Sequence, residues 1–145
     1  MKIGYIILVV LTHLMGCGNS NQGMNTIEAV HYESYGRRST FVFNIDPQKT
    51  TVKKTGLDAY EIEGKTTEAD WNDIVSLLSK IDIPNLENIE IPSTLHASDR
   101  APSGQLSIQV NNRTYSTQTF DDNNPPENLV KLIDRIYAIS DKMGR

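Results

Sequence analysis

Apolar and polar residues alternate along the first part of the chain in a way that predicts a meander of about four strands. The clearest alternation covers residues 40–46, where Phe41, Phe43 and Ile45 fall on one face. Asp46 and Pro47 then occupy the first two positions expected of a type I turn. Further strands are predicted over residues 26–35, 50–55 and 58–63.

A helical period follows the meander. Thr67, with an aspartate three residues later, is the predicted N-cap, and Pro84 ends the helix. We expect the apolar stripe to cover the sheet and to bury Trp71 near Phe41 or Phe43. This stripe consists of Trp71, Ile74, Val75, Leu77, Leu78 and Ile81.

The region 82–104 has no clear period, apart from a short strand predicted near residues 87–91. Irregular segments of this length inside a compact domain are usually functional or mobile. Asp99 and Arg100 are its candidate residues, and two interpretations stay open. They form an ion pair that fixes the loop in place, which we favour because Pro92 and Pro102 already bracket the loop, or they contact a partner.

The last part of the chain predicts a hairpin and a second helix. Residues 105–110 alternate, Asn111 and Asn112 suit a type I′ turn, and residues 113–120 return as a strand. Asn124 is the predicted cap of a helix with an apolar stripe at Leu129, Leu132, Ile133, Ile136 and Ile139. The predicted fold class is therefore α+β: an antiparallel sheet of about five to six strands with two helices packed on one face, in the order strands-helix-strands-helix.

The N-terminus has the layout of a secretory signal peptide, with Lys2 before an apolar run at residues 3–11 that is too short to cross a bilayer. Leu14, Met15 and Gly16 then precede Cys17 and resemble the lipobox of bacterial lipoproteins. This resemblance implies that Cys17 is acylated and becomes the first residue of the mature protein. The alternative is a free thiol, because a single cysteine cannot form a disulfide within the chain.

The expected organisation is a signal peptide at 1–16, the lipidated cysteine with a flexible tether at 17–25, and a single α+β domain at 26–145. The acyl chains on Cys17 would bind the membrane of the cell envelope. Gly18 rather than aspartate follows the cysteine, so we expect the outer membrane, while the periplasmic or surface face stays open. With 14 basic and 18 acidic side chains, the chain is not expected to bind nucleic acid.

Candidate catalytic groups are few. His31 and His96 are the imidazole bases of the predicted domain, and we expect neither to be catalytic. There is no glycine-rich phosphate loop, no paired-histidine motif and no cysteine cluster, so we predict no enzyme activity, no cofactor and no metal. The run 121–124 offers calcium-type oxygens, but Pro125 and Pro126 replace the continuation that an EF-hand needs. We therefore expect an acidic helix N-terminus there.

The stretches 92–101 (PSTLHASDRA) and 113–136 (RTYSTQTFDDNNPPENLVKLIDRI) resemble a group of small bacterial lipoproteins of unknown function. The likeness covers roughly residues 26–140 and implies an extracytoplasmic α+β domain with no known activity. The order of elements and the loop residue Asp99 are also similar to emfourin-type inhibitors of metalloproteases.

Two functions are therefore expected. The first is a lipid-anchored, non-catalytic binding or structural module of the cell envelope. The alternative is an inhibitor of an envelope or secreted protease that acts through the loop 92–104. A rigid, exposed loop would favour the inhibitor, because ordering before binding reduces the entropy lost on association.

Overall fold

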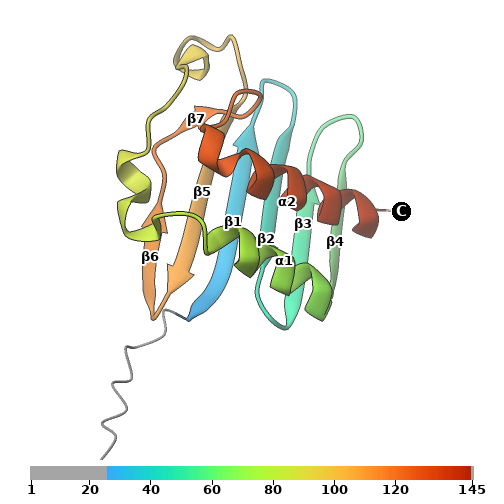
Figure 1. Cartoon of the computed structure of the whole chain (residues 1–145). Helices are drawn as coiled ribbons and strands as arrows, with labels where there is room; N and C mark the ends of the chain where they lie inside the picture. The colour runs from blue at the N-terminus through green and yellow to red at the C-terminus, as the bar shows by residue number, and fades with distance from the viewer. Residues whose placement is uncertain (1–25, 145) are drawn as a thin grey trace, which may run out of the picture.

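The computed structural model describes residues 26–144, which form a seven-stranded antiparallel sheet with two main helices (Figure 1). The α+β class and the antiparallel sheet are thus confirmed. The strand order is β4-β3-β2-β1-β5-β6, and β7 pairs with β5. The strands are β1 (Ile27–Tyr35), β2 (Thr40–Ile45), β3 (Lys49–Lys54), β4 (Tyr60–Lys65), β5 (Ser103–Val110), β6 (Arg113–Ser116) and β7 (Phe120–Asp121). The helices are α1 (Glu68–Leu78) and α2 (Val130–Met143), with short 3₁₀ helices η1 (Ile83–Asn88), η2 (Leu95–Ser98) and η3 (Glu127–Leu129).

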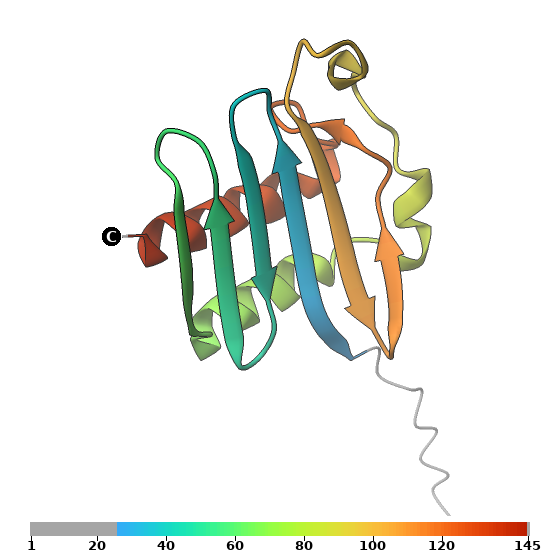
Figure 2. The same cartoon turned by 180° about the vertical axis from the view of Figure 1, so that it is seen from behind.

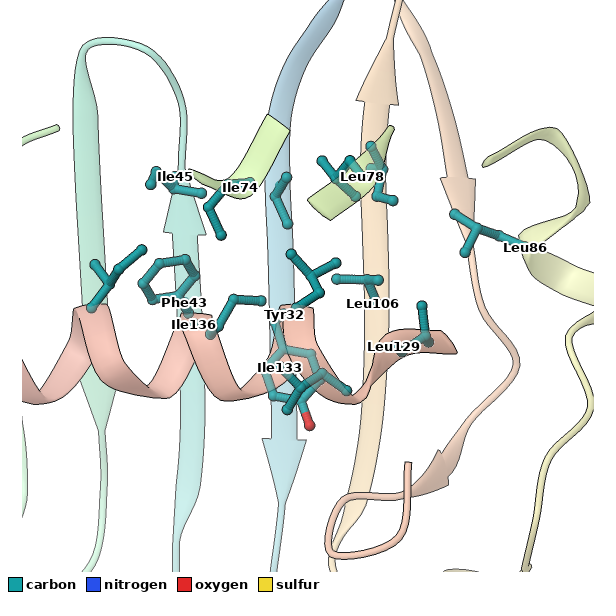
Figure 3. Packing of buried hydrophobic residues seen from close by; sticks show 14 of the residues in the cluster. Tyr32, Phe43, Ile45, Ile74, Leu78, Leu86, Leu106, Leu129, Ile133 and Ile136 are labelled. Carbon is teal, nitrogen blue, oxygen red and sulfur yellow. The ribbon is translucent and has the colours of Figure 1, made fainter. Parts of the chain in front are cut away.

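Both main helices lie in front of the sheet in Figure 1 and behind it in Figure 2. The burial of the strands follows from this arrangement, because successive side chains of a strand point to opposite faces. In β1, Val30, Tyr32 and Ser34 are buried, and the residues between them are only partly buried. Figure 3 shows the resulting core, with Phe43 of the sheet close to Ile136 of α2.

Two predicted turns are confirmed in detail. The Asp46 carboxylate accepts the backbone N–H groups of Gln48 at 2.7 Å and Lys49 at 2.8 Å. Asn111 and Asn112 have φ angles of 49° and 61°, as the hairpin turn between β5 and β6 requires. The register of the sheet is thus defined by turns that the sequence specifies locally.

The first turn of α1 is linked to α2 through Asp70. The predicted cap is confirmed, since the backbone N–H of Asp70 donates to Thr67 Oγ1 at 3.1 Å. The Asp70 carboxylate accepts from Arg135 at 2.7 Å and from Lys142 at 3.2 Å. Burial raises the pKa of Asp70, but hydrogen bonds from Thr67 and Lys142 and the positive charge of Arg135 outweigh it and lower the pKa.

This link explains why the prediction for Trp71 is wrong. The inward ridge of α1 consists of Asp70, Ile74 and Leu78, which are four residues apart, so Trp71 lies beside the ridge and is only partly buried. The polar Asp70 can occupy an inward position because Arg135 and Lys142 of α2 compensate its charge.

Two predicted elements are also wrong. The strand near residues 87–91 is absent from the described residues, since η1 occupies Ile83–Asn88 with a proline in its first turn. The last helix does not begin at Asn124, because η3 and then α2 start further along the chain. Asn124 instead belongs to the turn after β7, where its backbone N–H donates to the Asp121 carbonyl oxygen and its side-chain amide donates to Ser93 Oγ.

Gly104 of β5 lies where the sheet is most tightly packed. A Cβ atom there would be 2.8 Å from both the Phe120 ring and the Tyr32 hydroxyl, and both of these residues are fully buried. Gly104→Ala should therefore lower the free energy of unfolding by about 1–3 kcal/mol, measured by chemical denaturation. Gly64→Ala is the matched control, since its Cβ would meet only the flexible end of Met143 at 3.3 Å. Equal losses in the two variants would contradict this packing.

Candidate functional site

The Asp121 carboxylate is the most heavily hydrogen-bonded acid in the described residues. Its side chain is fully buried at the end of β7 and accepts from Ser93 Oγ, from the backbone N–H groups of Leu95 at 3.0 Å and His96 at 2.7 Å, and from His96 Nδ1 at 2.6 Å. β7 is positioned by its pairing with β5, where Ser103 lies opposite Asp121. One carboxylate therefore binds three residues of the loop 92–104 with four hydrogen bonds.

Asp121 acts as a remote cap for η2. The first N–H groups of a helix have no partner within the helix, and the N-cap residue Thr94 provides no side-chain hydrogen bond. Asp121 fills this role from β7, and a negative charge is favourable at a helix N-terminus. At the other end, Asp99 has a φ of 55° and donates its backbone N–H to the His96 carbonyl oxygen at 3.1 Å. Both ends of this helical turn are therefore defined.

The hydrogen bonds to Asp121 dominate its electrostatics. Burial alone raises the pKa of a carboxyl group, because it disfavours the charged form. Here the hydrogen bonds from Ser93, His96 and Leu95 outweigh burial and hold the pKa of Asp121 well below its usual range. Asp121 is thus charged at neutral pH.

The next residue, Asp122, forms hydrogen bonds with β1 and α2. Its carboxylate accepts from the hydroxyl of Tyr32 and from that of Tyr137 at 2.9 and 3.1 Å. Burial, with a contribution from the negative charge of Asp122, raises the pKa of both tyrosines, so both hydroxyls stay protonated as donors. Asp121 and Asp122 therefore tie the loop to β7 and the helix α2 to β1. A cleft of about 200 Å³ lies beside Asp122 and Tyr137. Its lining also includes Lys54, Tyr60 and Ser140.

The predicted candidates Asp99 and Arg100 are both exposed. Within residues 26–144, the Asp99 carboxylate makes no hydrogen bond or ion pair, and Arg100 Nε donates to Ser98 Oγ at 3.0 Å. The favoured interpretation, in which these two residues form an ion pair that fixes the loop, is therefore wrong. The loop is fixed by Asp121, which leaves the two side chains directed to solvent.

The acidic run 121–124 had been predicted to start a helix, and this is also wrong. Asp121 lies in a strand and Asp122 in the turn that follows. Phe120 was the sequence signal that pointed to a strand here. A strand that continued through Phe120 would place a buried residue close to the irregular loop 92–104.

Ser93, His96 and Asp121 combine the residue types of a hydrolytic triad in a different arrangement. In a triad the serine donates to the histidine, which donates to the aspartate. Here the serine and the histidine both donate to the same carboxylate, and Asn124 donates to Ser93 Oγ at 3.0 Å. This geometry holds a loop and does not activate the serine. His31 lies elsewhere, on β1, and contacts Asn44 and Glu33.

A second cleft, of about 240 Å³, opens between the end of β1 and the loop 92–104. It is lined by residues that include Tyr35, Arg37, His96, Asp99 and Ser103.

Among residues 26–144 there is no cluster of three or more metal-ligating side chains. None of the helices in this part of the chain is long and apolar enough to cross a membrane. The predicted lipobox residues Leu14, Met15, Gly16 and Cys17 lie outside the described residues.

Neither a protein-family model nor a curated protein sequence matches this chain. The resemblances to small bacterial lipoproteins and to emfourin-type inhibitors therefore stay predictions.

The pKa of Asp121 leads to a pH-dependent prediction. A carboxyl group whose pKa is lower in the folded state stabilises the fold above its unfolded pKa of about 4, and this contribution is lost as the pH falls. Asp121→Asn should lower the melting temperature by about 5–10 °C at neutral pH. The difference in melting temperature between Asp121→Asn and the natural chain should become smaller below about pH 4. Differential scanning fluorimetry across this pH range measures both effects.

Asp99→Asn is the matched control, because it removes the same charge from an exposed side chain without a hydrogen bond within residues 26–144. Its melting temperature should stay within about 1 °C of the natural chain. A loss in Asp121→Asn that is the same at every pH, or an equal loss in Asp99→Asn, would contradict the assignment.

Proposed function

We propose that this chain is a lipid-anchored, non-catalytic protein of the cell envelope that binds a protein partner through the loop 92–104. The observation that carries this proposal is the hydrogen bonding of Asp121, which orders a loop whose residues from Leu95 to Arg100 are mostly exposed. A loop that is ordered before binding loses little conformational entropy on association.

The position of the loop relative to the anchor supports the same function. In the register of β1 and β5, Ile27 lies opposite Val110, whereas Tyr35 lies opposite Ser103. β1 has 9 residues and spans about 30 Å at roughly 3.4 Å per residue. An anchor at Cys17 precedes the Ile27 end, so the loop would project from the end of the sheet that faces away from the bilayer (Figure 2).

The arrangement of both helices on one face of the sheet fits a presenting scaffold. The helices and the sheet form a rigid two-layer core, and the loop lies at one end of it. Ser93 and His96 are engaged by Asp121, which is consistent with binding in place of catalysis.

Inhibition of an envelope or secreted protease is the second candidate, and the ordered, exposed loop favours it. A substrate-like inhibitor presents an extended strand to the protease. Residues 95–98 instead form the helical turn η2. An inhibitor of this shape would block access to the protease and would itself not be cut.

The loop function is tested by photo-crosslinking in the full, membrane-bound chain. A photoreactive amino acid at Ala97, an exposed residue of η2, should give a discrete adduct with one protein. Adding Asp121→Asn should reduce the adduct, because the loop then loses its fixed shape. The same photoreactive residue at exposed Thr114 of β6 is the control and should not give this adduct.

No discrete adduct from position 97, or the same adduct from position 114, would contradict the loop function. If the adduct is a protease, its activity in the presence of the purified chain separates the two candidates. Inhibition without cleavage of the loop supports the inhibitor, and unchanged activity supports binding alone.

The anchor is tested separately with Cys17→Ser. This variant should be recovered in the soluble fraction or stay uncleaved, because the acyl chains that hold the bilayer would be missing. Fractionation followed by immunoblotting measures the distribution, with the natural chain expected in the outer membrane. A cleaved Cys17→Ser chain that stays on the membrane would contradict the anchor.

A further inference from the structure

Large hydrophobic side chains are exposed mainly at one end of the sheet. Four large hydrophobic residues are exposed among residues 26–144, and three of them lie at this end: Tyr35 at 47%, Leu57 at 101% and Leu95 at 40%. Each belongs to a different connection at the loop end of the sheet. Singly exposed hydrophobic residues are ordinary, so these three bear on binding only together with the charge at the same end of the sheet.

The three connections form one continuous surface, which we call the loop-end surface: residues 35–39, 54–59 and 94–103. Figures 1 and 2 both show these connections along the same end of the sheet. The backbone N–H of Thr55 donates to the Thr40 carbonyl oxygen at 2.9 Å, which joins the first two connections. Ser103 Oγ donates to the Tyr35 carbonyl oxygen at 3.5 Å, which joins the first and the third.

Gly56 allows the closest of these approaches. Its φ is 105°, and a Cβ atom there would lie 2.6 Å from the Arg38 carbonyl oxygen. The two tight connections therefore hold each other, so that Leu57 is presented at a fixed distance from Arg38.

The charge of the loop-end surface differs from that of the whole chain. The chain carries a net charge of −4, whereas this surface has four cations and two carboxylates. Within residues 26–144 none of these six groups forms an ion pair, although Lys49 and Lys53 on the sheet pair with Glu63 and Glu61. The six groups are Arg37, Arg38, Lys54, Arg100, Asp58 and Asp99.

The cleft of about 240 Å³ lies within this surface, between Arg37 and His96. His96 Nδ1 is held by Asp121, which fixes the orientation of the ring at the cleft. Arg37 provides a planar group that can donate two parallel hydrogen bonds to a carboxylate. Asp99 also lines this cleft, so Arg37 is the group there that would receive a carboxylate of a partner.

We propose that the loop-end surface binds a protein segment that combines acidic and apolar residues. Carboxylates of the segment pair with Arg37, Arg38 and Arg100, and its apolar side chains cover Tyr35, Leu57 and Leu95. Interface centres are enriched in arginine and in aromatic residues, and this surface has three arginines and Tyr35. This inference rests on the proposed function and names the chemistry of the partner.

The test pans a random peptide library on phage against the full chain in detergent micelles. Selected peptides should be enriched in aspartate or glutamate next to aromatic or aliphatic residues. The most enriched peptide is then synthesised, and its Kd is measured by fluorescence anisotropy for the natural chain and for variants.

The double variant R37E/R38E should bind the peptide about tenfold more weakly or worse, and the natural chain should lose affinity as salt is raised. The double variant K65E/K80E is the matched control, because it changes the net charge equally. Lys65 is the last residue of β4, at the end of that strand away from the connection 54–59, and Lys80 follows α1. Its Kd should stay within about twofold. Leu57→Ser, which changes a fully exposed side chain, should also weaken binding without a change in melting temperature.

Three outcomes would overturn the proposal: no enriched peptide, enriched peptides without acidic residues, or equal losses in the two double variants. The photo-crosslinked adduct from Ala97 shows whether only the acidic segment is wrong or whether the proposed function is wrong as well. If the adduct forms and depends on Asp121 but is unaffected by R37E/R38E, the loop binds a partner and the acidic segment is wrong.

Discussion

The buried carboxylate of Asp121 accepts four hydrogen bonds from Ser93, Leu95 and His96, and these hold the first half of the loop 92–104 to β7. A carboxylate in such a place is favourable only while its donors surround it, because an unpaired buried charge is costly. The dependence is mutual, since the N–H groups of Leu95 and His96 would also lose their partner. The shape of the exposed loop therefore follows from one residue that lies 25 positions further along the chain than His96.

The neighbouring Asp122 extends the same constraint to the core. Its contacts with Tyr32 and Tyr137 connect β1 to α2, and the Tyr137 ring lies 4.7 Å from that of Phe41. Packing at this end of the sheet is close enough that Gly104 has no room for a side chain. The loop is thus attached to a closely packed part of the core. A binding surface on a rigid element keeps its geometry better than one on a free loop.

The sequence predicts those parts of the fold that depend on nearby residues. The alternation in β2, the turn at Asp46, the hairpin at Asn111 and the Thr67 cap are all specified within a few positions, and all are confirmed. Asp121 could not be assigned in this way, since Ser93 and Asp121 are 28 positions apart and the run 121–124 locally resembles a helix start. The inward position of Asp70 is likewise not specified locally, since the residues that compensate its charge, Arg135 and Lys142, lie on α2.

The most direct measurement is hydrogen exchange at the backbone amides of Leu95 and His96, in the natural chain and in Asp121→Asn. Exchange reports local opening, and a hydrogen-bonded amide exchanges only when its bond opens. If Asp121 orders the loop, both amides are protected in the natural chain. In the variant they exchange at least about tenfold faster, while the amides of β1 keep their protection. Equal protection of Leu95 and His96 in the two chains would contradict the central role of Asp121.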